Sequence, residues 1–165
     1  MSPRGSEASS VRDEPPAAPE WSVAAAVEGR EISFPNGFVG CTDWKRFMLQ
    51  SPPEHAPIRV LQSLDNPELA LFVLDPFLLS PDYAIDMPEA ERRLVQLEKV
   101  EDAVLLVLLV IRRDPLLVTA NLVGPVVINS RSGLGCQLVL EDTDYSVRHL
   151  VYSEHPGQGD KEDAA

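Results

Sequence analysis

The chain has 165 residues, 44% of them hydrophobic, which is enough for one domain with a substantial core and argues against a second core. It carries 26 acidic and 14 basic residues, a formal net charge of −12 at pH 7. This balance argues against direct binding to nucleic acid, because a phosphate backbone is recognised by clustered cations. An acidic domain can still act on RNA indirectly by holding a basic RNA-binding protein, although simple solubility also explains the charge.

The two ends of the chain differ in composition from its middle. Residues 1–26 are rich in Pro, Ala and Ser, and residues 153–165 are acidic and polar, so both predict disordered tails around a folded domain at 27–152. That domain retains 18 acidic and 11 basic residues, which gives it a formal charge of −7. Acidity is therefore a property of the predicted domain and not only of its tails.

The sequence also predicts where the protein acts. No basic stretch followed by an apolar one opens the chain, which indicates the lack of a secretory signal and predicts a cytoplasmic location. The longest strongly apolar run, residues 104–111, is much shorter than the roughly 18–20 residues that cross a bilayer. We interpret it as a core strand and expect no membrane association.

Short apolar runs separated by turn signals dominate the middle of the chain. They have the length of strands, and Pro, Gly, Asn or Asp follow most of them. This pattern predicts an all-β, mainly antiparallel fold, a small barrel-like domain with one or two short helices. The glycines of residues 129–135 predict a β-hairpin loop. The predicted strands are residues 31–34, 58–64, 69–74, 104–111, 116–122, 126–129, 136–140 and 145–152.

One segment has a helical pattern instead. Pro88 and Glu89 open a run of good helix formers with apolar residues at 90, 94 and 97, which predicts a short amphipathic helix over 88–97. Asp86 is expected near the N-cap of that helix.

The sequence contains no arrangement that predicts catalysis or a cofactor. Cys41 and Cys136 are the only cysteines, too few for a disulfide framework, and neither lies in a known nucleophile context. His55, His149 and His155 lack the spacing of metal ligands. We therefore expect a non-enzymatic protein with no metal or other cofactor.

A set of motifs in a fixed order points to a known family. The most characteristic is the stretch from Thr119 to Asn129, TANLVGPVVIN. The others are LQSLD at 61–65 with Pro67, Leu69, Ala70, Phe72 and Val73; Asp75-Pro76; Pro81-Asp82-Tyr83; QLVL at 137–140; and Tyr145 with Arg148. Together they resemble the FliW family of flagellar assembly factors over about residues 29–151. The segment FPNGFVG at 34–40 and the loop SPPEHAP at 51–57 depart from the family pattern, which concerns local loop geometry.

The resemblance implies a small antiparallel barrel-like fold that binds two protein partners and catalyses no reaction. One partner is flagellin, and the other is CsrA, a small dimeric RNA-binding protein that represses translation of the flagellin message. In this family, FliW released when flagellin is exported captures CsrA, whereas accumulating cytoplasmic flagellin occupies FliW and leaves CsrA free to repress. The antagonism is implied to be non-competitive with RNA, acting at a CsrA surface away from the RNA site.

The loop that follows Asp75-Pro76 is the main candidate for contact with a partner. Its apolar residues form either an exposed docking patch or a loop folded back on the core, and both interpretations stay open. Acidic residues nearby would steer a basic partner toward it. The residues predicted to bind partners are Phe77, Leu78, Asp82, Tyr83, Asp86, Glu89, Gln62, Asn121 and Asn129.

The last three of these residues have a structural interpretation as well. Gln62 precedes the turn Asp65-Asn66-Pro67, and an asparagine at a strand end, such as Asn121 or Asn129, usually bonds nearby backbone. Pro125 cannot donate to a ladder, so it predicts a sheet edge or a bulge, and an interrupted edge could accept an extended peptide from a partner.

Two other functions fit the same fold prediction. One is a generic protein-interaction adaptor without flagellar partners. The other is a small-ligand binder that uses the barrel interior, which requires a closed apolar pocket of roughly 300 Å³ or more. The many Leu and Val side chains predict that the interior is filled instead.

Overall fold

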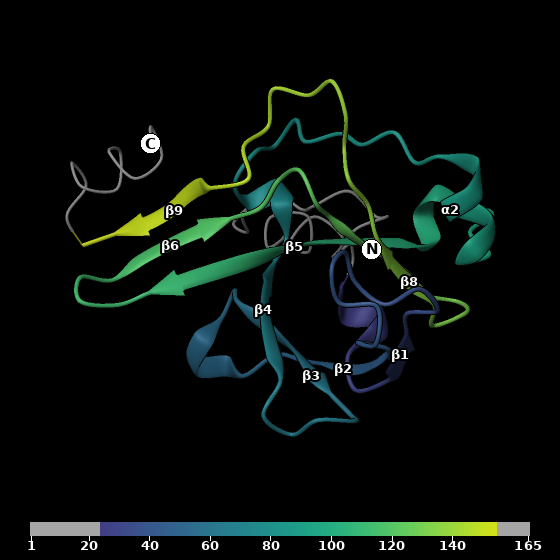
Figure 1. The fold of residues 1–165 in the computed structure, drawn as a ribbon, viewed down its shortest axis with the longest axis horizontal. Helices are drawn as coiled ribbons and strands as arrows, with labels where there is room; N and C mark the ends of the chain where they lie inside the picture. Colours follow the sequence, from purple (N-terminus) through teal and green to yellow (C-terminus); the bar gives the residue numbers. More distant parts are fainter. Residues whose placement is uncertain (1–23, 155–165) are drawn as a thin grey trace, which may run out of the picture.

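The structure is a computed structural model that describes residues 24–154, and short antiparallel strands make up most of it (Figure 1). The strands are β1 (Glu31–Ser33), β2 (Arg46–Gln50), β3 (Arg59–Ser63), β4 (Ala70–Leu74), β5 (Ala103–Arg112), β6 (Leu117–Ala120), β7 (Val126–Asn129), β8 (Gly135–Gln137) and β9 (His149–Ser153). The helical segments are α2 (Glu89–Leu94) and the 3-10 turns η2 (Ala24–Val27), η3 (Pro53–His55), η4 (Pro76–Leu78) and η5 (Val100–Asp102). No helix within the described range is long and apolar enough to cross a membrane.

Strand β5 organises the sheet because it pairs along most of its length. Its first half, from Ala103 to Leu106, pairs with β7, and its second half, from Leu109 to Arg112, pairs with β6. Val107 and Leu108 pair with β4. From this centre the sheet continues in three directions, through β4 to β1, through β6 to β9, and through β7 to β8.

Strands β1 to β4 curl under β5 and β8 in the lower half of Figure 1. Each pairs antiparallel with the next, in a meander. The two ends of this curl meet at one isolated parallel bridge, between Ser33 and Leu134, where the Ser33 N–H donates to the Gly133 carbonyl at 2.9 Å. The all-β antiparallel fold is confirmed, and it is barrel-like without a continuous ladder closing the barrel.

The apolar run of residues 104–111 is explained by burial on both faces of the sheet. Val104 and Leu106 belong to the interior cluster, which also contains Phe34 and Phe47. Leu105, Val107 and Leu109 belong to a second cluster on the opposite face. A strand that is buried on both faces has a continuous run of apolar residues in its sequence, instead of apolar residues that alternate with polar ones.

The break in the stretch from Thr119 to Asn129 lies where β6 ends and β7 begins. Of the two alternatives predicted for Pro125, a sheet edge or a bulge, the edge is wrong, because β7 lies between β5 and β8. Pro125 is buried immediately before β7, and its carbonyl accepts from the Leu138 N–H at 2.8 Å. No ladder donor is needed at that point, which is why a proline fits there.

Several predicted boundaries need correction. Strand β2 was not predicted, and residues 145–148 form loop instead of the start of the last strand. Residues 24–26, assigned by prediction to the N-terminal tail, form η2 with Val27, and Ser153 ends β9. Glu154 is also described, and its N–H donates to the Leu116 carbonyl at 3.0 Å. Residues 1–23 and 155–165 of the predicted tails, with His155, lie outside the described residues.

The predicted helix over 88–97 is shorter, and Asp86 lies two residues before its N-cap. Pro88 occupies that position without a side-chain hydrogen bond, and Gln96 ends the turn with a φ of 59°. Asn129 explains the early end, because its side-chain amide donates to the Val95 and Gln96 carbonyls, each at 2.9 Å. A residue distant in sequence therefore satisfies the carbonyls at the end of α2.

Candidate protein-docking surface

The loop from Phe77 to Tyr83 is anchored to the body of the protein at both ends. At its start the Asp75 carboxylate accepts from the Phe77 N–H at 2.9 Å and caps η4, while burial raises the pKa of Asp75. At its end the Tyr83 hydroxyl donates to the Leu122 carbonyl at 2.6 Å. The Tyr83 ring also lies 4.6 Å from the Tyr145 ring. These contacts give the loop a defined position against the second cluster.

The side chains of this loop differ in exposure. Tyr83 is 3% exposed and Phe77 is partly buried, so both pack mainly inward, whereas Leu78 is 58% exposed. Burial also raises the pKa of the Tyr83 hydroxyl. Asp82 is exposed. Of the two interpretations of this loop, the folded-back one therefore describes Tyr83, and among the predicted contacts of the loop Leu78 and Asp82 are the exposed ones.

The two asparagines and the glutamine predicted as contacts make structural bonds. Asn129 is 2% exposed, and besides holding the end of α2 its side-chain oxygen accepts from the Arg131 N–H at 2.9 Å. The Asn121 side-chain oxygen accepts from the Val123 and Gly124 N–H groups, each at 3.0 Å. The Gln62 amide donates to the Leu69 carbonyl at 3.1 Å. Asn129 and Gln62 lie on different parts of the fold from the loop after β4.

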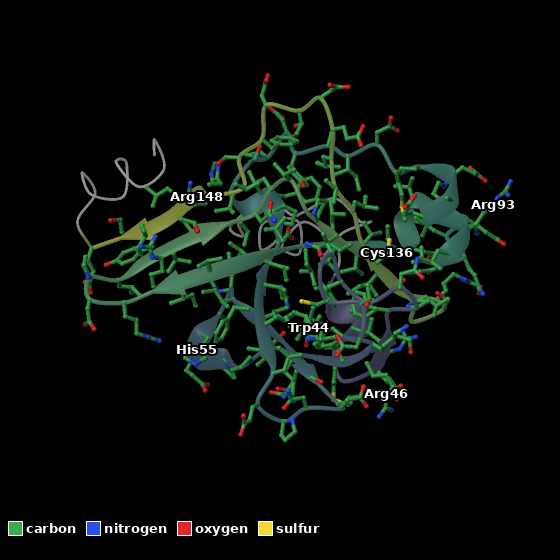
Figure 2. The ribbon with its side chains drawn as sticks, in the orientation of Figure 1. Trp44, Arg46, His55, Arg93, Cys136 and Arg148 are labelled. Atoms are coloured by element: carbon green, nitrogen blue, oxygen red, sulfur yellow. The ribbon has the colours of Figure 1, made fainter. Side chains whose placement is uncertain are left out.

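The remaining predicted contacts, Asp86 and Glu89, lie at the two ends of a short connection into α2. Both are exposed, and the Glu89 carboxylate accepts from Arg93 at 3.2 Å one helical turn later. Arg93 lies at the surface of α2 in Figure 2. Asp86 instead faces a groove that the sequence did not reveal.

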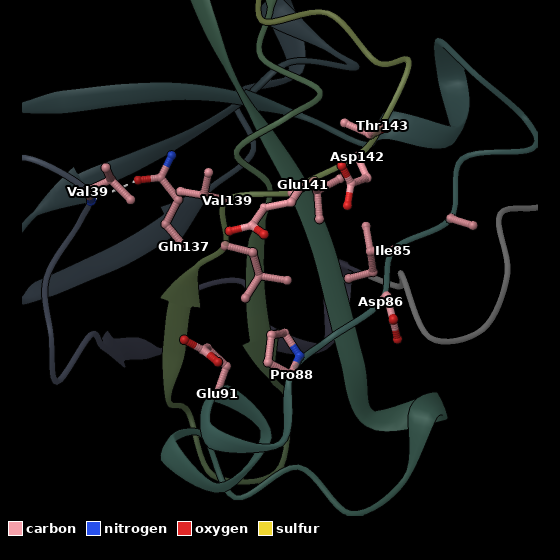
Figure 3. Close-up of a pocket in the computed structure, with 13 residues that line it drawn as sticks. Val39, Ile85, Asp86, Pro88, Glu91, Gln137, Val139, Glu141, Asp142 and Thr143 are labelled. Carbon is pink, nitrogen blue, oxygen red and sulfur yellow. Dashed lines mark hydrogen bonds between the residues drawn. The ribbon is translucent and has the colours of Figure 1, made fainter.

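This groove, which we call the acidic groove, lies between residues 84–91 and residues 137–143 and has a volume of about 710 Å³ (Figure 3). Its apolar lining includes Val39 and Val139, each 59% exposed, together with Ile85. Four carboxylates line it and no lysine or arginine does: Asp86, Glu91, Glu141 and Asp142.

Gln137 fixes the geometry at one end of the acidic groove. Its side-chain oxygen accepts from the Val39 N–H at 3.0 Å, and its side-chain nitrogen donates to the Gly124 carbonyl at 3.0 Å. A Cβ on Gly124 would lie 2.9 Å from this nitrogen, so a larger residue there would displace Gln137. The glycine of the VGPVV segment therefore permits the close approach that joins three chain segments at the groove.

The structure offers no arrangement suited to metal binding among residues 24–154. Cys41 and Cys136 are free thiols, and burial raises the pKa of Cys136 to about 12, with a smaller contribution from Glu91. A thiol that stays protonated is a poor nucleophile. Cys136 lies inside the body of the protein in Figure 2.

Comparisons with known proteins identify the family. The family model described as "FliW protein" matches residues 22–151. The chain belongs to the FliW family. The flagellar assembly factor FliW of Bacillus licheniformis is 35% identical over 127 residues, covering 77% of this chain and 89% of that protein. The one from Natranaerobius thermophilus is 32% identical over 137 residues, covering 82% of this chain and 91% of that protein.

A solved structure supports the same conclusion for the fold. A crystal structure of the flagellar assembly factor FliW superimposes with a TM-score of 0.69 at 32% identity, covering 75% of this chain and 86% of that chain. The predicted resemblance to FliW is confirmed. The predicted partner-contact residues stay predictions, and the acidic groove was missed because it is formed by segments about 50 residues apart in the sequence.

Proposed function

We propose that this FliW-family protein binds flagellin and binds the RNA-binding translational repressor CsrA in the cytoplasm, and that it catalyses no reaction. Capture of CsrA would relieve repression of the flagellin message, and flagellin would compete by occupying the same protein. The observation that carries the proposal is the family match across residues 22–151, which spans nearly all of the described fold.

The charge of the domain supports a basic partner. The described surface combines a net acidic domain with a groove lined by four carboxylates. Proteins that bind RNA carry clustered cations, and opposite charge speeds encounter and favours the correct partner. An acidic protein that antagonised such a repressor would not need to occupy the RNA site itself, since it could bind a separate basic surface.

The filled interior gives no support to small-ligand binding inside the barrel. Phe34, Phe47, Leu49 and Leu61 are fully buried in the interior cluster. Gly135 has no side chain where a Cβ would come within 2.7 Å of the Phe34 ring. Interiors packed at this density leave little room for a ligand of ordinary size.

The proposal is tested by calorimetric titration of the protein with CsrA and with flagellin from its own organism. We expect binding to both, and we expect flagellin to reduce capture of CsrA. An unrelated protein of similar net charge serves as the control for non-specific attraction. Binding to neither partner, or equal binding by the control, would contradict the proposal.

A second measurement tests the mode of antagonism. Labelled flagellin-leader RNA is titrated with CsrA at several fixed concentrations of this protein. Non-competitive antagonism predicts that excess RNA does not restore full RNA binding to CsrA. Full restoration at high RNA concentration would instead show direct competition for the RNA site.

A further inference from the structure

We propose that the acidic groove binds an extended, basic segment of a partner protein as an added β-strand along the outer edge of residues 137–141. This inference rests on the proposed function, because it names the chemistry of the partner segment that the protein holds. It adds a location, a backbone geometry and a charge pattern.

The edge is an extension of β8 that has one paired side and one open side. Beyond Gln137 the chain stays hydrogen-bonded to the segment that precedes β7, since the Leu138 N–H donates to the Pro125 carbonyl and the Leu140 N–H donates to the Val123 carbonyl, both at 2.8 Å. Backbone groups of successive residues in a strand point to opposite sides. Those of Val139 and Glu141 therefore point away from the paired segment.

No partner within the described residues bonds these outward groups. The N–H groups of Val139 and Glu141 take part in no hydrogen bond there, and neither do their carbonyls. The barrel seam explains the opening: among the described residues, the backbone of β1 pairs with this side of the sheet at a single bridge, between Ser33 and Leu134. Beyond that bridge, the facing segment touches the edge through the Gln137 side chain, which accepts from the Val39 N–H. An unpaired edge of this kind is a template for strand addition.

The groove beside this edge has an apolar floor that suits alternate side chains of an extended segment. Val39 and Val139 are both 59% exposed, and Ile85 lies on the opposite wall in Figure 3. Exposed apolar side chains gathered in one groove are typical of protein contact sites. A strand laid along residues 137–141 would direct every second side chain toward these residues.

The charges of the groove select the partner. Asp86 and Glu91 come from one wall and Glu141 and Asp142 from the other, with no lysine or arginine among the lining residues (Figure 3). Like charges at short range disfavour an acidic occupant. The parts of this chain outside the described range carry a formal −2 each, since residues 1–23 hold four acids and two bases and residues 155–165 hold three acids and one base. A basic segment of another protein fits better than either end of this chain.

The charge test compares two double variants with the same change in net charge. Asp86→Lys with Glu141→Lys reverses one carboxylate on each wall, and both residues are exposed. Glu54→Lys with Glu68→Lys reverses two exposed carboxylates on η3 and on the turn between β3 and β4, away from the groove. We expect the groove variant to bind at least about tenfold more weakly and the control to stay within about threefold of the unmodified protein.

Two probes are titrated against each variant. One is full-length CsrA, and the other is a labelled heptapeptide of alternating lysine and valine, which carries the proposed charge and spacing. Binding should weaken with added salt, because attraction between accessible charges is screened. An alternating glutamate and valine peptide should not bind.

The edge is tested by amide exchange measured by NMR. On saturation with either probe, exchange of the Val139 and Glu141 amides should slow, whereas the Leu138 and Leu140 amides are already bonded in the unbound protein. The variant Val139→Pro removes the outward N–H donor at that position together with the exposed valine side chain. It should therefore weaken binding by at least about fivefold, the value of one hydrogen bond. If this variant does not fold, the exchange measurement on the unmodified protein still shows whether the edge of residues 137–141 pairs with the probe.

The outcomes separate this inference from the proposed function. Equal affinity of CsrA for both double variants would overturn the inference and leave the proposed function standing. If CsrA and flagellin fail to bind but the basic peptide binds with the expected losses, the proposed function fails and the inference stands. The inference would be overturned by failure of both probes to bind or by unchanged exchange of the Val139 amide on saturation. It would also be overturned if this amide already exchanges slowly in the unbound protein and removal of residues 1–23 abolishes that protection.

Discussion

The interior face of β5 and β7 packs against aromatic side chains, whereas the outer face is covered by a long connection that adds polar bonds to its apolar packing. On the inside, Phe47 lies 5.7 Å from Phe34 and 5.4 Å from Phe38, ring to ring. On the outside, Tyr83 and Asn129 hold residues 75–98 through bonds to main-chain carbonyls. Close apolar packing supplies most of the folding free energy, while directional bonds position a segment and leave its other side accessible.

This difference implies that the free energy of unfolding and the binding of partners depend mainly on different parts of the molecule. The aromatic interior has no accessible surface to offer a partner, whereas the outer connection forms one wall of the acidic groove. Changes inside the barrel should therefore alter the free energy of unfolding strongly. Changes on the outer connection should have smaller effects on unfolding and larger effects on binding.

The largest effect is expected for Phe47→Ala. Phe47 is fully buried, and removal of its ring leaves a cavity among Phe34 and Phe38, so the free energy of unfolding should fall by about 3–5 kcal/mol. Urea unfolding followed by circular dichroism measures it. Phe72→Ala is the matched control, because Phe72 is 37% exposed on β4 and its loss should cost less than about 1.5 kcal/mol. Similar losses in the two variants would contradict the comparison.

A smaller effect is expected for Tyr83→Phe, which removes the hydroxyl that donates to the Leu122 carbonyl. The free energy of unfolding should fall by about 1–2 kcal/mol at pH 7, since one buried bond is lost and the Leu122 carbonyl stays buried. Urea unfolding at pH 7 measures this loss. A loss below about 0.3 kcal/mol would show that the outer connection is held by packing alone.

The same variant predicts a pH dependence. Burial raises the pKa of Tyr83 in the folded protein, so above the unfolded value of about 10 the unfolded chain releases a proton that the folded protein retains. The contribution of Tyr83 to the free energy of unfolding is therefore fully present below about pH 10 and is lost as the pH rises above that value. By pH 11 the unmodified protein should lose about 1.4 kcal/mol that Tyr83→Phe does not lose, so the two curves should converge. A constant difference would contradict a raised pKa.

The sequence predicted the interior better than the outer face, and the residues show why. Residues 104–111 and 126–129 were recognised as strands because burial on both faces leaves a continuous apolar signal. Strand β2 was missed because its run is short, begins with the charged residues Lys45 and Arg46, and has the apolar Met48 between the buried Phe47 and Leu49, so that no clear alternation marks it.

The outer face depends on contacts that no local pattern carries. The end of α2 is determined by Asn129, more than 30 residues away, and the position of Tyr83 by Leu122. The acidic groove exists because two such segments are brought together and because the seam between β1 and β8 closes at only one bridge. Motif recognition found the family without revealing this surface.

The smallest effect on stability is expected for the double variant Leu78→Ser with Asp82→Lys. Leu78 is 58% exposed and Asp82 is exposed without an ion pair to a described residue, so unfolding should change by less than about 0.5 kcal/mol. If the loop from Phe77 to Tyr83 docks a partner, calorimetry should nevertheless show CsrA or flagellin binding weakened by tenfold or more. The pair Val100→Ser with Glu98→Lys, also exposed but outside that loop, is the control. Unchanged affinity for both partners in the loop variant would remove this loop from the recognition surface, because Leu78 and Asp82 are the exposed side chains among the predicted loop contacts. Tyr83 would then act only by positioning the outer connection.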